Sequence, residues 1–262
     1  MPEGDTILRA ARALHIAVAG RLVTAFESAL PRLSSASIEG RTIERVHAAG
    51  KHLLMQFSGD LVLRTHMGMH GSWHIYRPGE RWRRRRSDMR ILITTREIDA
   101  VAFSVHDAEF RRGRAPIEAV ARLGPDLLAE RFDAQEALAR LRRRPSDEIA
   151  DALLNQQLIA GAGNIYKSEA LFAARTNPFS RVSALADEDL LRILAITRGL
   201  LQRNVDQSGP WMRRTTSALT PGGRFAVYGR RGKACQRCGA RIEGKRQGPH
   251  GRLTYWCPRC QR

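Results

Sequence analysis

Four cysteines are the residues of this 262-residue chain whose spacing points most directly to a chemistry. They form two Cys-x2-Cys pairs near the C-terminus, separated by 18 residues: Cys235, Cys238, Cys257 and Cys260. Each pair can chelate a metal from a tight turn, and this spacing fits a four-thiolate zinc site on a β-hairpin. Because four protein ligands close the coordination shell, the sequence predicts one structural Zn2+. Four unrelated thiols are the weaker interpretation.

A second group of candidates lies at the N-terminus, where Pro2 and Glu3 precede apolar residues of helical spacing. In one interpretation they only start a helix, since proline suits the first turn and an acidic residue complements the helix dipole. In the other, removal of Met1 leaves Pro2 with a secondary amine, which is a nucleophile. The pair alone does not decide between these interpretations.

The elements that must position these residues follow from hydrophobic periodicity. Residues 5–19 have the helical period, and Gly20 is suited to end that helix. The next segments alternate as short strands do, which predicts an antiparallel β-sandwich or barrel: 42–48, 52–57, 61–65, 71–76, 89–95 and 98–105. The basic run at 81–86 is expected on an exposed loop.

The pattern changes near residue 123, and helical segments follow at 134–143, 147–158, 164–174 and 187–206. We therefore expect an α+β protein with an N-terminal helix, a β-sandwich, a helical domain and a β-hairpin zinc finger. The expected limits are 1–123 for the N-terminal domain, 124–133 for a linker, 134–225 for the helical domain and 226–262 for the finger.

The charge balance predicts a polyanionic partner. The chain has 44 Lys and Arg against 26 Asp and Glu, a formal net charge of +18. Nucleic acid is the usual partner of such a chain, although anionic membranes and acidic proteins also attract basic surfaces. Since no apolar stretch reaches the roughly 18 residues of a membrane span and no secretory signal is present, a cytoplasmic location without membrane contact is expected.

Five features, in this order and spacing, resemble the formamidopyrimidine-DNA glycosylase and endonuclease VIII family, and the likeness spans the whole chain. They are Met1-Pro2-Glu3-Gly4, Gly50-Lys51, Leu123-Gly124-Pro125-Asp126, Gly161-Ala162-Gly163-Asn164-Ile165-Tyr166 and the cysteine finger with Arg252. The Pro-Glu-Gly start is more similar to the endonuclease VIII branch. The Gly-x-Gly-Asn segment resembles the helix-two-turn-helix motif, which would make residues 134–225 the DNA-binding domain of that name.

The resemblance implies a bifunctional glycosylase and lyase that acts as a monomer on damaged double-stranded DNA. Pro2 would attack the sugar C1′, release the base and form an iminium that permits β- and δ-elimination. Glu3 would protonate the deoxyribose ring oxygen, and this chemistry needs no metal or organic cofactor. Lys51 would contact phosphate and donate a proton during β-elimination.

The resemblance assigns further DNA contacts. Asn164, otherwise a simple helix N-cap, would bind phosphate at a helix start. Arg252 would bind phosphate and assist δ-elimination, and Arg122 would be a DNA-contacting arginine. The segment Gly68-Met69-His70 would hold the stack open, with Met69 as intercalator and His70 beside it; Met69 as a core residue is the alternative.

The wedge segment departs from the endonuclease VIII branch, which typically carries Gln-Leu-Tyr there, and is more similar to the formamidopyrimidine branch. Thr6 also stands where many relatives have glutamate. From the Pro-Glu-Gly start we expect oxidised pyrimidines such as thymine glycol as preferred bases. The sequence leaves open the opposite-base preference, the choice between duplex, bubble and single strand, and the extent of δ-elimination.

Two other functions compete with this one. The first is a relative that binds abasic or damaged DNA without cutting it, against which Pro2, Glu3 and Lys51 together argue. The second is a basic zinc-ribbon protein that binds nucleic acid structurally. The charge and the cysteines agree equally well with a zinc-ribbon protein. That interpretation does not explain Pro-Glu at the start or the Gly161–Asn164 turn.

Overall fold

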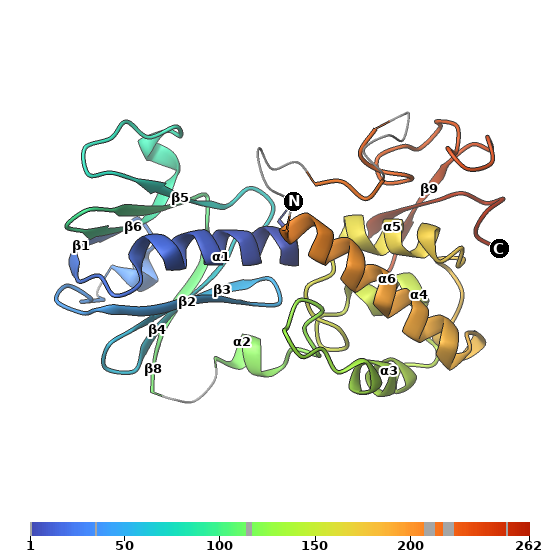
Figure 1. Cartoon of the computed structure of the whole chain (residues 1–262), viewed down its shortest axis with the longest axis horizontal. Coiled ribbons are helices and arrows are strands. Elements are labelled where there is room, and N and C mark those ends of the chain that lie inside the picture. The colour runs from blue at the N-terminus through green and yellow to red at the C-terminus, as the bar shows by residue number, and fades with distance from the viewer. Residues whose placement is uncertain (1, 35, 114–116, 207–212, 217–222, 250) are drawn as a thin grey trace. The chain divides into compact units, whose positions relative to one another are not determined.

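The computed structural model describes residues 2–34, 36–113, 117–206, 213–216, 223–249 and 251–262. The chain divides into two compact units, Met1–Arg122 and Leu123–Arg262. The first unit combines a long helix with two sheets, and the second combines helices with a C-terminal hairpin (Figure 1), so the expected α+β class is confirmed. In the described ranges, no helix combines the length and the apolar character needed to cross a membrane.

The first unit is a helix packed with two four-stranded antiparallel sheets, in the orders β1-β6-β7-β5 and β2-β3-β4-β8. Its helices are α1 (Gly4–Val18) and the short α2 (Glu118–Ala121). Its strands are β1 (Val23–Ser28), β2 (Ile43–Ala49), β3 (His52–Phe57), β4 (Leu61–His66), β5 (Ser72–Tyr76), β6 (Met89–Thr95), β7 (Asp99–Phe103) and β8 (Asp107–Arg112).

The larger of two hydrophobic clusters in the described part of this unit joins α1 to both sheets. The apolar stripe of α1, with Ile7 and Leu14, shares the core with inward residues of both sheets such as Ile93 and Met55. These side chains alternate along β3, β4 and β6, as expected for sheets with one face on a core. The core therefore holds α1, whose first turn follows Pro2 and Glu3, firmly on the sandwich.

Two strands, β1 and β8, were not expected from the sequence. In β1 only Val23 is buried and in β8 only Ala108, so neither shows a hydrophobic run. β8 is held instead by pairing with β4 and by the buried Arg64, whose guanidinium is 2.6 Å from both Asp107 Oδ1 and Glu109 Oε1. Such pairing depends on residues far away in the chain, which a local pattern does not contain.

The second unit packs four helices around its own core and carries the hairpin at its C-terminus (Figure 1). The elements are α3 (Ala134–Arg142), α4 (Ile149–Leu154), α5 (Asn164–Ala173), α6 (Asp187–Val205), β9 (Glu243–Gln247) and β10 (Arg252–Trp256). The helix expected at 147–158 is shorter, because α4 ends at Leu154 and a turn follows.

That turn, residues 155–163, is closed by the side chain of Gln156. Its Nε2 donates to Leu154 O and Ala162 O at 3.0 Å, and its Oε1 accepts from Gly161 N at 3.0 Å. Gly161 has φ +99°, a conformation that favours glycine. These bonds satisfy one carbonyl of the ended helix and two backbone groups of the turn, and they place the start of α5.

The Leu-Gly-Pro-Asp segment supports the same turn. Ala160 N donates to Pro125 O at 3.0 Å and Leu127 N donates to Ala160 O at 3.1 Å. A Cβ on Gly124 would lie 2.3 Å from Leu158 O, so only glycine permits this approach. The motif therefore has a structural role beside the Gly-x-Gly-Asn turn.

Candidate functional site

The first turn of α1 buries two carboxyl groups. Glu3 is the N-cap residue of α1 and is fully buried, as is Asp5, while Pro2 is half-buried. Glu3 O accepts from Thr6 N at 2.9 Å and from Ile7 N at 3.1 Å. Burial of carboxyl groups costs free energy unless they are bonded, and an ordinary helix start leaves such groups in water. The arrangement is typical of a functional site at the N-terminus.

Thr6, the departure from relatives with glutamate, takes part in this turn. Its hydroxyl lies 3.4 Å from Asp5 Oδ1, a long hydrogen bond. A short hydroxyl side chain therefore keeps a polar contact within the first turn of α1, although it lacks the charge of a carboxylate.

Lys51 lies in the turn between β2 and β3, after Gly50 with φ +57°. Two imidazoles lie close to it, on the adjacent ends of β3 and β4, with ring centroids of His52 and His66 5.2 Å apart. Burial lowers the pKa of His52 to about 4, with further contributions from His66, Arg64 and Lys51 that outweigh the opposing carboxylate of Asp107. Burial also lowers the pKa of His66. Both rings are thus neutral at pH 7, and the charges beside them are those of Lys51, Arg64 and Asp107.

The depressed pKa of His52 predicts a pH-dependent stability. As the pH falls, His52 takes up a proton in the unfolded chain before it does so in the folded protein. The contribution of neutral His52 to the free energy of unfolding is therefore full above pH 6.5 and is lost as the pH falls toward 4. Between pH 7 and pH 5 the wild type should lose about 1–2 kcal/mol more than a His52→Gln variant in urea unfolding. The exposed His106→Gln variant, as matched control, should behave as the wild type does. Equal losses in all three proteins would refute the assignment.

The turn between β4 and β5 separates two methionines. Met67 is 3% exposed and belongs to the core, whereas Met69 is 55% exposed. The turn is tight, because Gly71 N donates to Met67 O at 2.8 Å and a Cβ on Gly71 would lie 2.3 Å from that oxygen. Its other side chain, His70, is exposed. The interpretation of Met69 as a core residue is therefore wrong.

A pocket of about 280 Å3 lies beside this turn, which we call the wedge loop (residues 67–71). His66 and His106 line it with Ser104 and Asp107. The first unit therefore gathers the wedge loop, the two imidazoles and the Lys51 turn at one end of β3 and β4.

Arg122, an expected DNA contact, is the C-cap residue of α2. It forms an ion pair with Glu118, and both side chains are more than half exposed. Exposed pairs of this kind contribute about 0–1 kcal/mol, so the pair does not prevent Arg122 from exchanging its partner.

Asn164 is not the helix N-cap that the sequence suggested. Gly163 takes that position, with extended backbone, and Asn164 is the first helical residue. Its Nδ2 donates to Leu253 O at 2.9 Å, and its buried Oδ1 has no hydrogen-bond partner within the described ranges. Since Leu253 follows Arg252, the structure brings the two predicted phosphate contacts of this unit together, through a bond that no sequence pattern signals.

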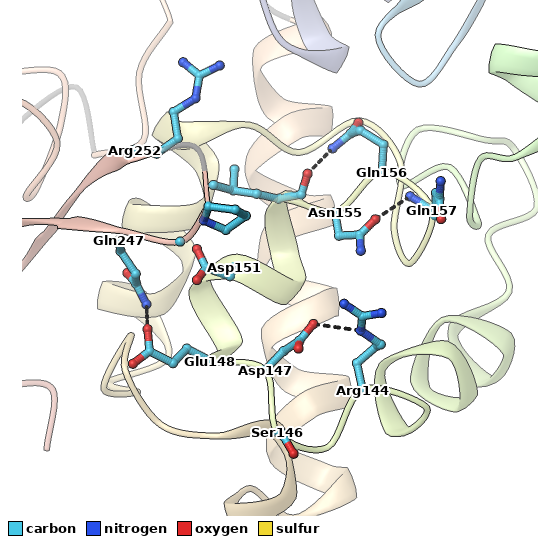
Figure 2. A pocket seen from close by; sticks show the side chains of 13 residues that line it. Arg144, Ser146, Asp147, Glu148, Asp151, Asn155, Gln156, Gln157, Gln247 and Arg252 are labelled. Atoms are coloured by element: carbon cyan, nitrogen blue, oxygen red, sulfur yellow. Dashed lines mark hydrogen bonds and ion pairs between the residues drawn. The ribbon is translucent and has the colours of Figure 1, made fainter.

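Arg252 is exposed at the start of β10, at the rim of a pocket of about 780 Å3. Figure 2 shows its guanidinium directed away from the carboxylates of Glu148 and Asp151, which line the same pocket. A Cβ on Gly248 would lie 2.3 Å from Asp151 Oδ1, so the hairpin tip approaches α4 closely. The hairpin is thus seated on the helical domain at Gly248.

A buried polar chain that the sequence analysis missed fixes the hairpin to α5 and α4. The fully buried Lys167 donates to Thr254 Oγ1 at 2.7 Å, and Thr254 Oγ1 donates to Gln247 Oε1 at 2.6 Å. Gln247 Nε2 in turn donates to Glu148 Oε2 at 2.6 Å and to Pro178 O at 3.1 Å. Lys167 stands three residues after Asn164 in a helix whose second half, residues 170–173, is apolar, and a charged residue this close to the Gly-x-Gly-Asn turn was the available signal.

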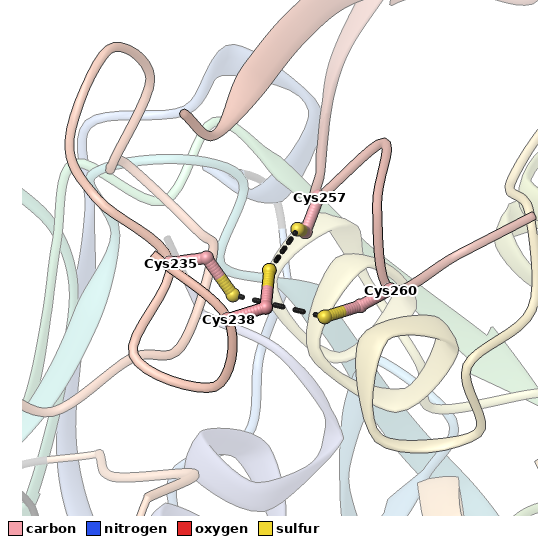
Figure 3. Close-up of side chains that lie close together, drawn as sticks. All are labelled: Cys235, Cys238, Cys257 and Cys260. Atoms are coloured by element: carbon pink, nitrogen blue, oxygen red, sulfur yellow. Dashed lines mark hydrogen bonds between the residues drawn. The ribbon is translucent and has the colours of Figure 1, made fainter. Parts of the chain in front are cut away.

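The four cysteines gather within the finger (Figure 3), with all ligand atoms within 4.8 Å of one another. The Sγ atoms of Cys235 and Cys260 are 4.0 Å apart, and those of Cys238 and Cys257 are 3.4 Å apart. Zinc bonds of about 2.3 Å in a tetrahedron require sulfur separations of about 3.8 Å, so the cluster fits the ion. The predicted site for one structural zinc is confirmed.

Three family models match the chain in succession. They are the formamidopyrimidine-DNA glycosylase N-terminal domain over residues 1–113, the H2TH domain of the same enzyme over 123–215, and a zinc finger found in FPG and IleRS over 232–262.

Curated relatives match over the full length. Probable endonuclease 8 2 of Streptomyces coelicolor is 38% identical, over 100% of this chain and 94% of the relative. Endonuclease 8 2 of Mycobacterium bovis is 36% identical over all of both chains, and DNA-(apurinic or apyrimidinic site) lyase Nei2 of Mycolicibacterium smegmatis is 34% identical over 100% and 99%.

The fold is that of a solved relative bound to DNA. The formamidopyrimidine-DNA glycosylase of Lactococcus lactis, in complex with DNA containing an abasic site, superposes with a TM-score of 0.82 at 23% identity, over all of both chains. The succession of family models and the full-length relatives agree with this fold. The chain belongs to the formamidopyrimidine-DNA glycosylase and endonuclease 8 family.

Proposed function

We propose that this protein is a bifunctional DNA glycosylase and abasic-site lyase that excises oxidised bases from double-stranded DNA through Pro2. The observation that carries the proposal is the start of the chain: Pro2 directly precedes a helix whose first turn buries Glu3, in a chain with full-length relatives named endonuclease 8 and Nei2. A structural zinc-ribbon protein would need neither feature.

The chemistry begins with the secondary amine of Pro2, once Met1 is removed. Its nitrogen forms a bond to the sugar C1′ while the bond from C1′ to the base breaks, and the base leaves with a proton. Glu3 gives a proton to the ring oxygen, so that the sugar opens to an iminium. A secondary amine gives an iminium that is cationic without protonation.

The iminium then acts as an electron sink. Loss of a proton from C2′ expels the 3′ phosphate, and a second elimination expels the 5′ phosphate. Lys51 would hold phosphate and supply a proton in the first step, and Arg252 would hold phosphate in the second. Asn164 and the amides at the start of α5 form a further phosphate site in this proposal, and the positive potential of a helix N-terminus supports it.

The remaining parts of the proposal concern DNA binding. The exposed Met69, with His70, would fill the space left by the extruded nucleotide. Arg122 would contact the backbone, and the zinc finger would hold Arg252 in place. We further propose that the protein acts as a monomer, with the domain limits given above.

The proposed substrates are oxidised pyrimidines. Single-turnover base release should be at least about tenfold faster from thymine glycol than from 8-oxoguanine opposite cytosine, a difference of about 1.4 kcal/mol in transition-state free energy. The support is the Pro-Glu-Gly start and the endonuclease 8 relatives. Equal or faster release of 8-oxoguanine would overturn this preference while leaving the lyase proposal intact.

A further inference from the structure

The segment between β5 and β6 contains a basic run that has no part in the proposed function. Residues 81–86 read Arg-Trp-Arg-Arg-Arg-Arg, and we call them the arginine arm. Their side chains divide by position. Trp82, Arg84 and Arg86 contact the body of the first unit, although Arg86 itself is exposed, and Arg81, Arg83 and Arg85 are exposed as well.

Contacts of Trp82 and Arg86 hold the arm in place. The Trp82 ring stacks on Tyr76 with centroids 6.3 Å apart and meets the edge of Phe103 at 5.5 Å. The Arg86 guanidinium lies 5.1 Å from the Trp82 ring centroid, and its NH2 is 2.7 Å from Glu27 Oε2. The arm is thus an anchored segment, unlike a mobile basic tail.

Arg84 joins the arm to the wedge loop. Its NH1 donates to His70 O at 3.2 Å, and its NH2 donates to Ser104 Oγ at 3.3 Å. Asp88 balances its charge at 3.7 Å. The arm therefore runs past the loop that is proposed to enter the base stack.

The positive charges of Arg81, Arg83 and Arg85 are not neutralised within the described part of the chain. In the described part of the chain, no carboxylate pairs with Arg81, Arg83 or Arg85, and no acceptor binds their guanidinium groups. Three like charges held close together repel one another, and this destabilises the folded state. A polyanion would relieve that repulsion.

We propose that Arg81, Arg83 and Arg85 form an additional contact with the sugar-phosphate backbone of the duplex that flanks the lesion. The inference rests on the proposed function, because that function places DNA at the wedge loop. Arginine suits phosphate through its planar fork of donors. The contact is independent of base sequence and does not reach the reacting atoms, so it strengthens binding without altering the chemical step.

The test compares binding of full-length proteins to a 25-base-pair duplex with a stable abasic-site analogue, across a range of salt concentrations. Each phosphate contact contributes about 0.9 to the slope of log K against log salt. A triple variant with Arg81→Ala, Arg83→Ala and Arg85→Ala should lower that slope by about 2–3 and weaken Kd by about tenfold at 0.1 M salt. Lysine at all three positions should restore the slope.

The matched control removes three exposed arginines at the other end of the sheets: Arg96→Ala, Arg111→Ala and Arg112→Ala. Arg96 precedes β7, whose far end leads to Ser104, and β8 runs from Asp107 at the wedge loop pocket to Arg112. This variant should leave the slope nearly unchanged. Equal changes in the two triple variants, or no change in either, would overturn the proposal.

A second readout separates this inference from the proposed function. At saturating protein, base release by the arm variant should equal that of the wild type. Loss of salt dependence in the arm variant, with no base release by the wild type, would refute the proposed function but support the phosphate contact of the arginine arm. Normal base release with an unchanged slope would refute the arm alone.

Discussion

A Pro2→Gly variant is expected to bind abasic duplex as the wild type does but to cleave it at least about 100-fold more slowly, the scale of a lost catalytic group. Glycine at position 2 leaves a primary amine. Its imine must gain a proton before it can accept electrons, whereas the iminium of Pro2 is permanently cationic. Single-turnover strand cleavage and binding to an uncleavable analogue measure the two quantities separately.

Pro31→Gly is the matched control for this variant. Pro31 starts a short 3-10 helix in the same unit and is exposed, so the change removes a proline ring elsewhere. Cleavage by this control should remain within about twofold of the wild type, because proline effects on such a turn are about 1 kcal/mol of stability or less. Full strand cleavage by Pro2→Gly would count against Pro2 as nucleophile.

Removal of zinc is expected to weaken DNA binding by about 100-fold or more and to leave the first unit folded. The finger presents Arg252, and its β10 supplies the carbonyl that Asn164 binds. Structural zinc contributes about 10–16 kcal/mol to the folding of such modules at neutral pH. The remaining anchors of the hairpin include the bonds of Gln247, each about 1 kcal/mol, and Arg237 stacked 4.2 Å over Phe172. Zinc therefore contributes most of the free energy that keeps the finger folded.

Hydrogen exchange after chelation locates the effect. Amides of β9 and β10 should lose protection, while those of α1 and the sheets should keep it, and added zinc should reverse the change. Cys257→Ser, which removes a buried ligand, should reproduce the chelated state. Metal-stripped protein with undiminished DNA affinity would show that the other anchors suffice.

The fold was predictable where local pattern and packing agree. The helix of residues 5–19 and six strands were expected, because each carries its own apolar period into a shared core. β1 and β8 were missed, because pairing with distant strands holds them. The end of α4 at Leu154 was missed for a similar reason. The side chain of Gln156 closes the turn there, and only the folded backbone shows which atoms it meets.

In the candidate site, too, local features could be predicted from the sequence, whereas contacts between distant segments could not. The cysteines were predictable because metal coordination fixes ligand type and spacing within one short module. Asn164 was assigned to the N-cap, since cap preference is a local property, but its bond to Leu253 depends on where the hairpin lies. The roles of Pro2, Lys51 and Arg252 came from resemblance and stay predictions.

Borohydride trapping tests the central claim most directly. Purified protein with Pro2 confirmed as its N-terminus is mixed with duplexes that carry either an abasic site or thymine glycol. Borohydride reduces an imine to a stable amine, so the account predicts a covalent adduct on both duplexes, with the modified peptide mapped to Pro2. An adduct on neither duplex, or one mapped to a lysine, would contradict it.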